Sequence, residues 1–217
     1  MLHFVQHDNS KFYIPRSGER GSNIKFTITI PIWLVWIAIQ PVLLYRCLRY
    51  GYAFCRIPLS QGKYAIVDPD DYFRLSKHKW FVIKGCSTFY AARSVNRRGK
   101  RYRIRMHREV IKVPDDMFVD HINQNGLDNR KANLRPATCA QNIRNRKKYA
   151  VKSRSRYKGL LWDNYWKKWR VRIYLNRNQI HLGFFDDEIE AAKAYDRGAI
   201  KYHGQFASLN FPDGRKT

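Results

Sequence analysis

The alternation of hydrophobic and polar residues predicts short strands and short helices through the middle of the chain. Strands are expected where apolar residues recur at every second position, and a helix is expected where a polar cap precedes a helical period. The expected elements are a strand at Lys63–Val67, a short helix capped by Asp68 with Pro69 at its first position, a strand at Trp80–Ile83, and a hairpin of Phe89–Val95 and Tyr102–Met106 around the turn NRRGK. The hairpin arms carry Arg93, Arg101, Arg103 and Arg105, so one face is expected to be strongly cationic.

A charge-free stretch runs from Phe26 to Tyr45, and three arginines follow it. About 20 apolar residues span a bilayer, so the stretch is just long enough, and the arginines would keep the remainder in the cytoplasm. Its two prolines, glutamine and two threonines argue against a span, and its alternating start is equally typical of a strand. A membrane tether through residues 26–45 and a buried or poorly folded extension are therefore both open. A secretory signal is not expected, because no small-residue cleavage site follows.

The segment from His107 to Lys148 carries the candidate chemistry. Its pattern predicts a strand end at Phe118–Val119, then a loop with an Asn-Gly turn, then a helix that Thr138 is expected to cap. Polar residues stand at each of these points: Asp120 and His121 directly after the strand, Asn133 after the loop, and Asn142 one turn into the helix. His107 ends the preceding strand and is expected to be structural, with contact to phosphate or to the active site as the less favoured alternative.

At these positions the chain resembles the H-N-H endonuclease family, in particular the branch found in homing endonucleases of phage and mobile introns. The match rests on the Asp120–His121 pair, on Asn133 twelve positions later and on Asn142 nine positions after that. The resemblance implies a ββα-metal fold with one divalent cation held by Asp120 and Asn142. It also implies that His121 is the general base, and that Asn133 braces the loop and orients His121.

The chemistry of these side chains agrees with the implied roles. A neutral imidazole with a pKa of about 6.5 can accept a proton from water at neutral pH. Oxygen ligands suit Mg²⁺, with Mn²⁺ as the alternative, and argue against a tight zinc site. A cation there would stabilise charge on the phosphate and on the departing 3′-oxygen. Arg144, Arg146 and Lys147 continue the same helix and are expected to contact the DNA backbone.

From Arg156 to about Pro212 the pattern predicts a three-stranded sheet packed on one helix. Alternation gives the sheet an apolar inner face that includes Trp169, Val171, Ile173 and Leu175, and a basic, aromatic outer face that includes Arg170, Arg172, Tyr174, Gln179 and His181. Asp186 or Asp187 is expected to cap the helix, and Gly204 is expected to end it. Small alanines on the helix would let it lie close to the sheet.

This segment resembles the plant Apetala/ethylene-response-factor (ERF) DNA-binding domain. The matching motifs are Tyr157-x-Gly159, Trp166, Leu182-Gly183-x-Phe185, Ala191-Ala192-x-Ala194-Tyr195-Asp196 and Leu209-Asn210-Phe211-Pro212. The resemblance implies that the outer face lies in the major groove of DNA, with Trp166, Arg172, Tyr174, Gln179 and His181 at DNA-facing positions. Lys158 and Arg170 are also expected to bind DNA. Leu161 and Asp163 stand where plant members carry contact arginines, so the plant target sequence does not carry over.

The composition adds a polyanion partner to this interpretation. The 217 residues include 42 Lys and Arg against 17 Asp and Glu, a net charge of +25, and 44% are hydrophobic. Such a surface binds nucleic acid with little regard to sequence, although a merely soluble basic protein has the same charge. Four widely spaced cysteines without a C-x-x-C pair fit reduced thiols in an intracellular protein better than a disulfide framework or a zinc ribbon.

The sequence thus predicts an α+β protein made of several parts. These are a poorly structured N-terminus at 1–25, a hydrophobic extension at 26–56, an H-N-H nuclease domain with a preceding small β/α region at 57–147, a basic linker at 148–155, and an ERF-like domain at 156–212.

The expected function is metal-dependent, homing-type cleavage or nicking of double-stranded DNA, as in mobile elements, at sites chosen by the ERF-like domain. The protein would be cytoplasmic and DNA-associated, as a monomer or as a dimer on DNA. The alternative is a DNA-binding transcription regulator with an inactive nuclease domain. Intact Asp120, His121 and Asn142 weigh against this alternative.

Overall fold

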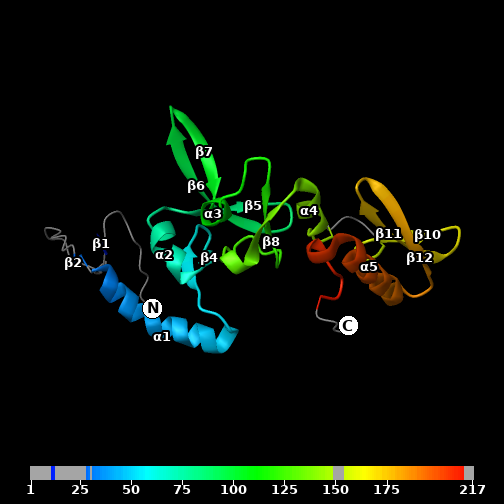
Figure 1. Ribbon diagram of the computed structural model, residues 1–217, viewed down its shortest axis with the longest axis horizontal. Coiled ribbons are helices and arrows are strands. Elements are labelled where there is room, and N and C mark those ends of the chain that lie inside the picture. Colours follow the sequence, from blue (N-terminus) through cyan, green and yellow to red (C-terminus); the bar gives the residue numbers. More distant parts are fainter. Residues whose placement is uncertain (1–10, 13–27, 30, 149–153, 213–217) are drawn as a thin grey trace, which may run out of the picture. The chain divides into compact units, whose positions relative to one another are not determined.

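The computed structural model describes residues 11–12, 28–29, 31–148 and 154–212 (Figure 1). The chain divides into two compact units, residues 1–82 with 91–106 and residues 83–90 with 107–217. Small antiparallel sheets and helices build both units, so the predicted α+β class is confirmed. The predicted ERF-like domain at 156–212 falls within the second unit, whereas the predicted nuclease domain at 57–147, with its preceding β/α region, is divided between the two units.

The first unit consists of short paired strands and two helices. Its elements are β1 Lys11–Phe12, β2 Ile28–Thr29, α1 Ile32–Tyr50, β3 Cys55–Pro58, β4 Tyr64–Val67, α2 Pro69–Ser76 and the hairpin strands β6 Phe89–Arg97 and β7 Lys100–Arg105, with β5 Phe81–Lys84 paired to β6. The strands, helix and hairpin predicted between residues 63 and 106 are therefore confirmed within one or two residues. The turn between β6 and β7 is formed by Arg98 and Gly99, both of which have a left-handed backbone conformation.

The arginines of this hairpin do not all share a face. Alternation along β7 puts Arg101, Arg103 and Arg105 on one side. Arg93 pairs with Ile104, so it lies on the opposite side of the ribbon. One face of the hairpin is therefore cationic, as expected, but it carries three of the four arginines, because cross-strand register decides on which face Arg93 lies.

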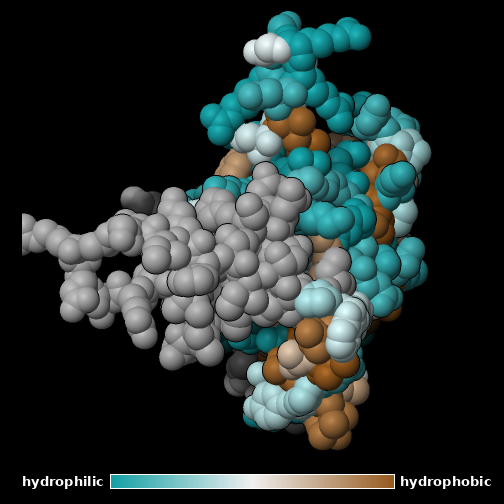
Figure 2. Space-filling view, turned by 90° about the vertical axis from the view of Figure 1, so that its left-hand side faces the viewer, coloured by the Kyte–Doolittle hydropathy of each residue, from teal (hydrophilic) through white to brown (hydrophobic). Residues whose placement is uncertain are grey.

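The charge-free stretch becomes the short strand β2 followed by α1, a helix that continues to Tyr50 with Pro41 inside it. Within the described residues, no helix meets the length and apolarity that crossing a bilayer requires. Several large apolar side chains of α1 face outward, including Trp33 at 60% exposure and Leu48 at 80%. In the view of Figure 2, hydrophobic residues gather at the lower end of the molecule, and hydrophilic residues cover the hairpin at the upper end. Most of the predicted unstructured N-terminus lies outside the described residues.

The nuclease segment of the second unit is a ββα arrangement. After the short helix α3 Met106–Val110, its elements are β8 Phe118–His121, the 3-10 turn η1 Lys131–Asn133, β9 Leu134–Ala137 and α4 Cys139–Arg144. Thr138 caps α4 in a capping box with Gln141, as its residue type predicted. Asp120 and His121 belong to β8 itself, because they pair with Arg135 and Leu134 of the antiparallel β9.

The C-terminal segment is the predicted sheet on a helix. Its strands run in the order β10 Leu160–Asp163, β11 Lys168–Leu175 and β12 Asn178–Phe185, and α5 Glu188–His203 packs against them, followed by the 3-10 turn η2 Gly204–Phe206 (Figure 1). Asp187 caps α5 through the backbone N–H of Glu190, and Gly204 ends it. The inner-face residues Trp169, Val171 and Ile173 are buried against alanines of α5, as the alternation predicted.

Candidate functional site

Asp120 lies at the centre of a buried polar network. Its side chain is 5% exposed, and its Oδ2 accepts a hydrogen bond from Nε of Arg135 at 2.9 Å and lies 2.7 Å from the Nη2 of that arginine. The amide nitrogen of Asn145 donates to both carboxylate oxygens at 2.9 and 3.0 Å and to the carbonyl of His121 at 2.9 Å. The carboxylate is thus fixed from the neighbouring strand and from the end of α4.

His121 lies beside Asp120 with its ring almost fully buried. Its Nε2 is 3.4 Å from Oδ1 of Asn129, whose amide nitrogen donates to the Leu127 carbonyl. Because the Asn129 amide oxygen can only accept, this contact favours the tautomer with the proton on Nε2 and the basic lone pair on Nδ1. Burial lowers the pKa of His121, against smaller upward effects of Asn129, Asp120 and Asp128. The imidazole is therefore neutral near pH 7, the form that can accept a proton.

Asn133 braces the loop that follows His121. Its Oδ1 accepts from the backbone N–H of Asn123 at 2.9 Å, and its Nδ2 donates to Asn123 Oδ1 and to the Asp128 carbonyl. The hydrogen bonds of Asn133 thus go to the loop, and the residue that contacts the His121 ring is Asn129. The bracing role implied by the resemblance agrees with this geometry, whereas orientation of His121 by Asn133 would be indirect.

An aromatic wall closes the other side of His121. The ring of His107 lies edge-on to the His121 ring at 5.1 Å between centroids, and Tyr90 lies 5.8 Å from both. A Cβ at Gly126 would stand 2.6 Å from the Tyr90 ring, so only glycine lets the loop approach this wall. His107 was expected to be structural at the end of a strand, with contact to the active site as the alternative. It lies in the short helix α3 Met106–Val110, and its ring packs against that of His121.

Asn142 and Asn145 lie three positions apart on one side of the α4 end. Asn145 is 4% exposed and holds Asp120, while the Asn142 side chain makes no hydrogen bond in the described part of the chain. The sequence analysis singled out Asn142 and missed Asn145, Arg135 and Asn129. The repeat of asparagine at a spacing of three could have indicated Asn145, but nothing local marks Arg135.

The donor types present fit a hard divalent cation. Asp120 Oδ1 accepts a single hydrogen bond, so it keeps a lone pair for a further partner. The side-chain amide of Asn142 has no hydrogen-bond partner among the described residues, and its oxygen is of the kind that Mg²⁺ prefers. Within the described residues, no three His, Cys, Asp or Glu side chains gather as a metal site.

The outer face of the C-terminal sheet presents the predicted DNA-facing side chains together. Cross-strand pairing sets Arg172 opposite His181, Tyr174 opposite Gln179 and Arg170 opposite Phe184. Gln179 Oε1 accepts from Arg172 Nη1 at 3.1 Å and from the Tyr174 hydroxyl at 3.0 Å, which leaves its amide nitrogen to donate elsewhere. Trp166 is 60% exposed near the Phe184 ring. One surface therefore combines cations, aromatic rings and amide donors.

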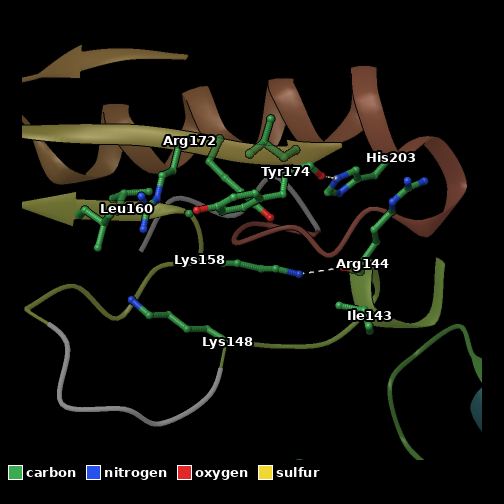
Figure 3. Close-up of a pocket in the computed structure, with 12 residues that line it drawn as sticks. Ile143, Arg144, Lys148, Lys158, Leu160, Arg172, Tyr174 and His203 are labelled. Carbon is green, nitrogen blue, oxygen red and sulfur yellow. Dashed lines mark hydrogen bonds between the residues drawn. The ribbon is translucent and has the colours of Figure 1, made fainter. Parts of the chain in front are cut away.

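α4 ends at Arg144, so the expectation that Arg146 and Lys147 continue the same helix was wrong. The basic residues at and after the end of α4, together with Lys158, divide into two kinds. Arg146 and Lys147 are exposed, and Arg144 donates to Asn176 of the β11–β12 turn. Lys158, by contrast, lies in a pocket of about 380 Å³, where its ammonium donates to the Arg144 carbonyl at 2.7 Å and the Arg146 carbonyl at 2.6 Å (Figure 3). Burial lowers the pKa of Lys158 to about 8. Contact of Lys158 with DNA remains a prediction, and its geometry favours a structural role.

The ends of the predicted linker lie close together. Lys148 donates to the carbonyls of Ser155 and Tyr157 at 2.7 and 2.8 Å, so the chain on either side of residues 149–153 is joined directly. The predicted linker itself falls largely on those residues, which lie outside the described part.

A ββα unit with an Asp-His pair on its strand and amides on its helix defines an HNH nuclease segment, and a three-stranded sheet on one helix with a basic outer face defines an ERF-like segment. A family model described as HNH endonuclease matches residues 111–144. An uncharacterized HNH endonuclease of Acanthamoeba polyphaga mimivirus is 29% identical over 164 residues, which are 72% of this chain and 80% of that relative.

The second segment has plant relatives. An AP2/ERF and B3 domain-containing protein of Oryza sativa subsp. japonica is 41% identical over 63 residues, 29% of this chain and 17% of the relative. An AP2-like ethylene-responsive transcription factor of Arabidopsis thaliana is 43% identical over 58 residues, 26% of this chain and 16% of the relative. No solved structure matches the chain. The chain therefore joins an HNH endonuclease segment to an AP2/ERF-like segment.

Proposed function

We propose that this protein is a metal-dependent DNA endonuclease whose AP2/ERF-like segment selects the site of cleavage. The observation that carries the proposal is the buried imidazole of His121 beside the carboxylate of Asp120, where burial lowers the pKa of His121 and so favours its neutral form. The name of the mimivirus relative and the family match agree with nuclease activity. The proposed substrate is double-stranded DNA, and the protein is accordingly DNA-associated.

His121 would act through Nδ1. The water proton moves to this nitrogen while the water oxygen forms a bond to phosphorus, and the bond from phosphorus to the 3′-oxygen breaks. The 3′-oxygen then takes up a proton. Asn129 supports this role because it holds the proton on Nε2, and the resulting imidazolium would lie next to the negative charge of Asp120.

Asp120 and Asn142 would hold the cation, with Mg²⁺ favoured and Mn²⁺ as the alternative. Such an ion supplies charge stabilisation at the scissile phosphate and at the leaving oxygen. Asn145 and Arg135 would keep the carboxylate in place while Asn133 keeps the loop closed.

The outer face of the sheet would bind DNA through Trp166, Arg170, Arg172, Tyr174, Gln179 and His181, with Arg144, Arg146 and Lys147 on neighbouring phosphates. Because the two segments share one chain, binding by the sheet raises the local concentration of the nuclease at the chosen sequence. We propose a homing-type enzyme of a mobile element on this basis. A single centre cuts one strand per visit, so nicking is the expected primary reaction.

Plasmid nicking in Mg²⁺ tests the proposal. The wild type is expected to convert supercoiled DNA to open circles, and His121→Ala is expected to slow this by roughly 10²–10⁴-fold. His78→Ala changes an exposed histidine outside the site and serves as the matched control, with no expected effect.

Two outcomes would contradict the proposal. Equal nicking by His121→Ala and the wild type would remove His121 from catalysis. Tight DNA binding by the wild type with no nicking in either Mg²⁺ or Mn²⁺ would favour the alternative, a DNA-binding regulator whose Asp120 is fully committed to Arg135 and Asn145.

A further inference from the structure

The arginine that holds Asp120 is itself held by the AP2/ERF-like segment. Arg135 Nη1 donates to the carbonyl of Gln205 at 2.7 Å, and its guanidinium carbon lies 3.9 Å from the centroid of the Phe206 ring. Both residues belong to η2, directly after α5. Phe206 is 5% exposed, so this cation–π contact is largely removed from water, where such contacts are strongest.

A second chain of hydrogen bonds connects the Asp120 carboxylate to the segment that follows α5. Ser208 is 4% exposed, and its hydroxyl accepts from Gln124 Nε2 at 3.0 Å. That amide also contacts Asn145 Oδ1 at 3.3 Å, and Asn145 donates to both oxygens of Asp120. Gln124 has a left-handed backbone with φ of 62°, so its position in the loop is constrained.

We propose that the segment Gly204–Ser208 of the AP2/ERF-like module completes the nuclease centre, with Arg135 and Gln124 as positioning residues that carry its support to Asp120. This inference rests on the proposed function, and it goes beyond it. The module does more than bring the nuclease to DNA, because its post-helix segment is part of what fixes the catalytic carboxylate.

The physical reason is the double use of one guanidinium. Arg135 has five N–H donors in a rigid fork, so fixing one edge against Gln205 and its face on Phe206 also fixes the edge that meets Asp120. Groups that orient a metal ligand from behind are typically worth about 10–100-fold in metal affinity or activity. Loosening Phe206 leaves every charge unchanged, so its effect reports positioning alone.

The test compares Phe206→Leu, Gln124→Ala and Arg135→Lys in the full chain. Phe206→Leu keeps an apolar side chain but removes the ring that lies against the Arg135 guanidinium. Arg135→Lys keeps the positive charge but loses the planar set of guanidinium N–H donors. Three quantities are measured for each variant: kcat and KM for nicking, Mn²⁺ affinity by titration calorimetry, and DNA affinity in EDTA by fluorescence anisotropy. Ile200→Ala, on an exposed position of α5, is the matched control, and circular dichroism melting checks folding.

Phe206→Leu and Gln124→Ala are each expected to lower kcat and Mn²⁺ affinity by about 10-fold, and Arg135→Lys by about 100-fold. KM and DNA affinity in EDTA should stay within about twofold. Arg172→Ala, on the DNA-binding face of the sheet, should have the opposite effect: its KM should rise while its Mn²⁺ affinity stays unchanged.

The inference is overturned if Phe206→Leu and Gln124→Ala, both folded, leave kcat and Mn²⁺ affinity at wild-type values. It is also overturned if their only effect is on DNA affinity. A wild type that binds Mn²⁺ more tightly than Phe206→Leu but never cuts DNA would support the inference and sink the proposed function. The two failures are therefore distinguishable.

Discussion

Lys158 offers a sharp test of how the basic residues are used. The sequence predicts it as a DNA-binding residue, yet its ammonium donates to the backbone carbonyls of Arg144 and Arg146. A charge that is held by protein carbonyls in a partly buried pocket releases no counterion from DNA. Lys158→Met should therefore leave the salt dependence of DNA binding unchanged.

The magnitude follows from counting phosphates. Each phosphate neutralised by a cation contributes about −0.9 to the slope of log Kobs against log salt. The residues proposed to lie on phosphates are Arg144, Arg146 and Lys147, so three contacts give a slope of about −2.7. Lys147→Ala should make this slope shallower by about 0.9, and Lys158→Met should alter it by less than about 0.3.

The assay is fluorescence anisotropy of a labelled random-sequence duplex in EDTA, with KCl varied between about 50 and 200 mM. Thermal melting of each variant controls for loss of the fold, since Lys158 joins two parts of the unit. If Lys158→Met flattens the slope as much as Lys147→Ala does, Lys158 contacts phosphate and the structural role argued from its carbonyl partners is refuted.

Three further predictions test the fold and the site. Gly159→Ala should lower the free energy of unfolding by about 3 kcal/mol in urea, because φ at Gly159 is +84° and the new Cβ would meet the Tyr195 ring at 1.9 Å. Gly99→Ala, where φ is +73° and no atom lies nearby, should lower it by only about 1 kcal/mol. Equal losses for the two variants would contradict the steric argument. The nicking rate should rise with pH through a midpoint below about 6.5 and be level above pH 7, because burial lowers the pKa of His121 and only its neutral form is a base; a midpoint above 6.5 would count against this assignment. Chelation by EDTA should abolish nicking while DNA binding persists, and full activity in EDTA would remove the metal from the mechanism.

Local pattern alone determined much of this protein. The alternation of Trp169, Val171 and Ile173 predicted both the strand and its buried face, because side chains alternate across a strand whatever lies next to it. The cap at Thr138 and the end of α5 at Gly204 were equally predictable, since each depends on residue type within one turn. The spacing of Asp120, His121 and Asn133 was likewise enough to predict a candidate site, whose catalytic role stays a prediction.

Tertiary structure decided which residues support that chemistry. Arg135 and Asn145 stand 15 and 25 positions from Asp120, and Gln205 stands 70 from Arg135, so no local period relates them. Strand register put Arg93 on the opposite face of its hairpin from Arg103, and packing turned Lys158 from the expected DNA surface toward carbonyls. Periodicity reports which face of an element is buried, whereas partners across strands and between segments exist only once the chain has packed.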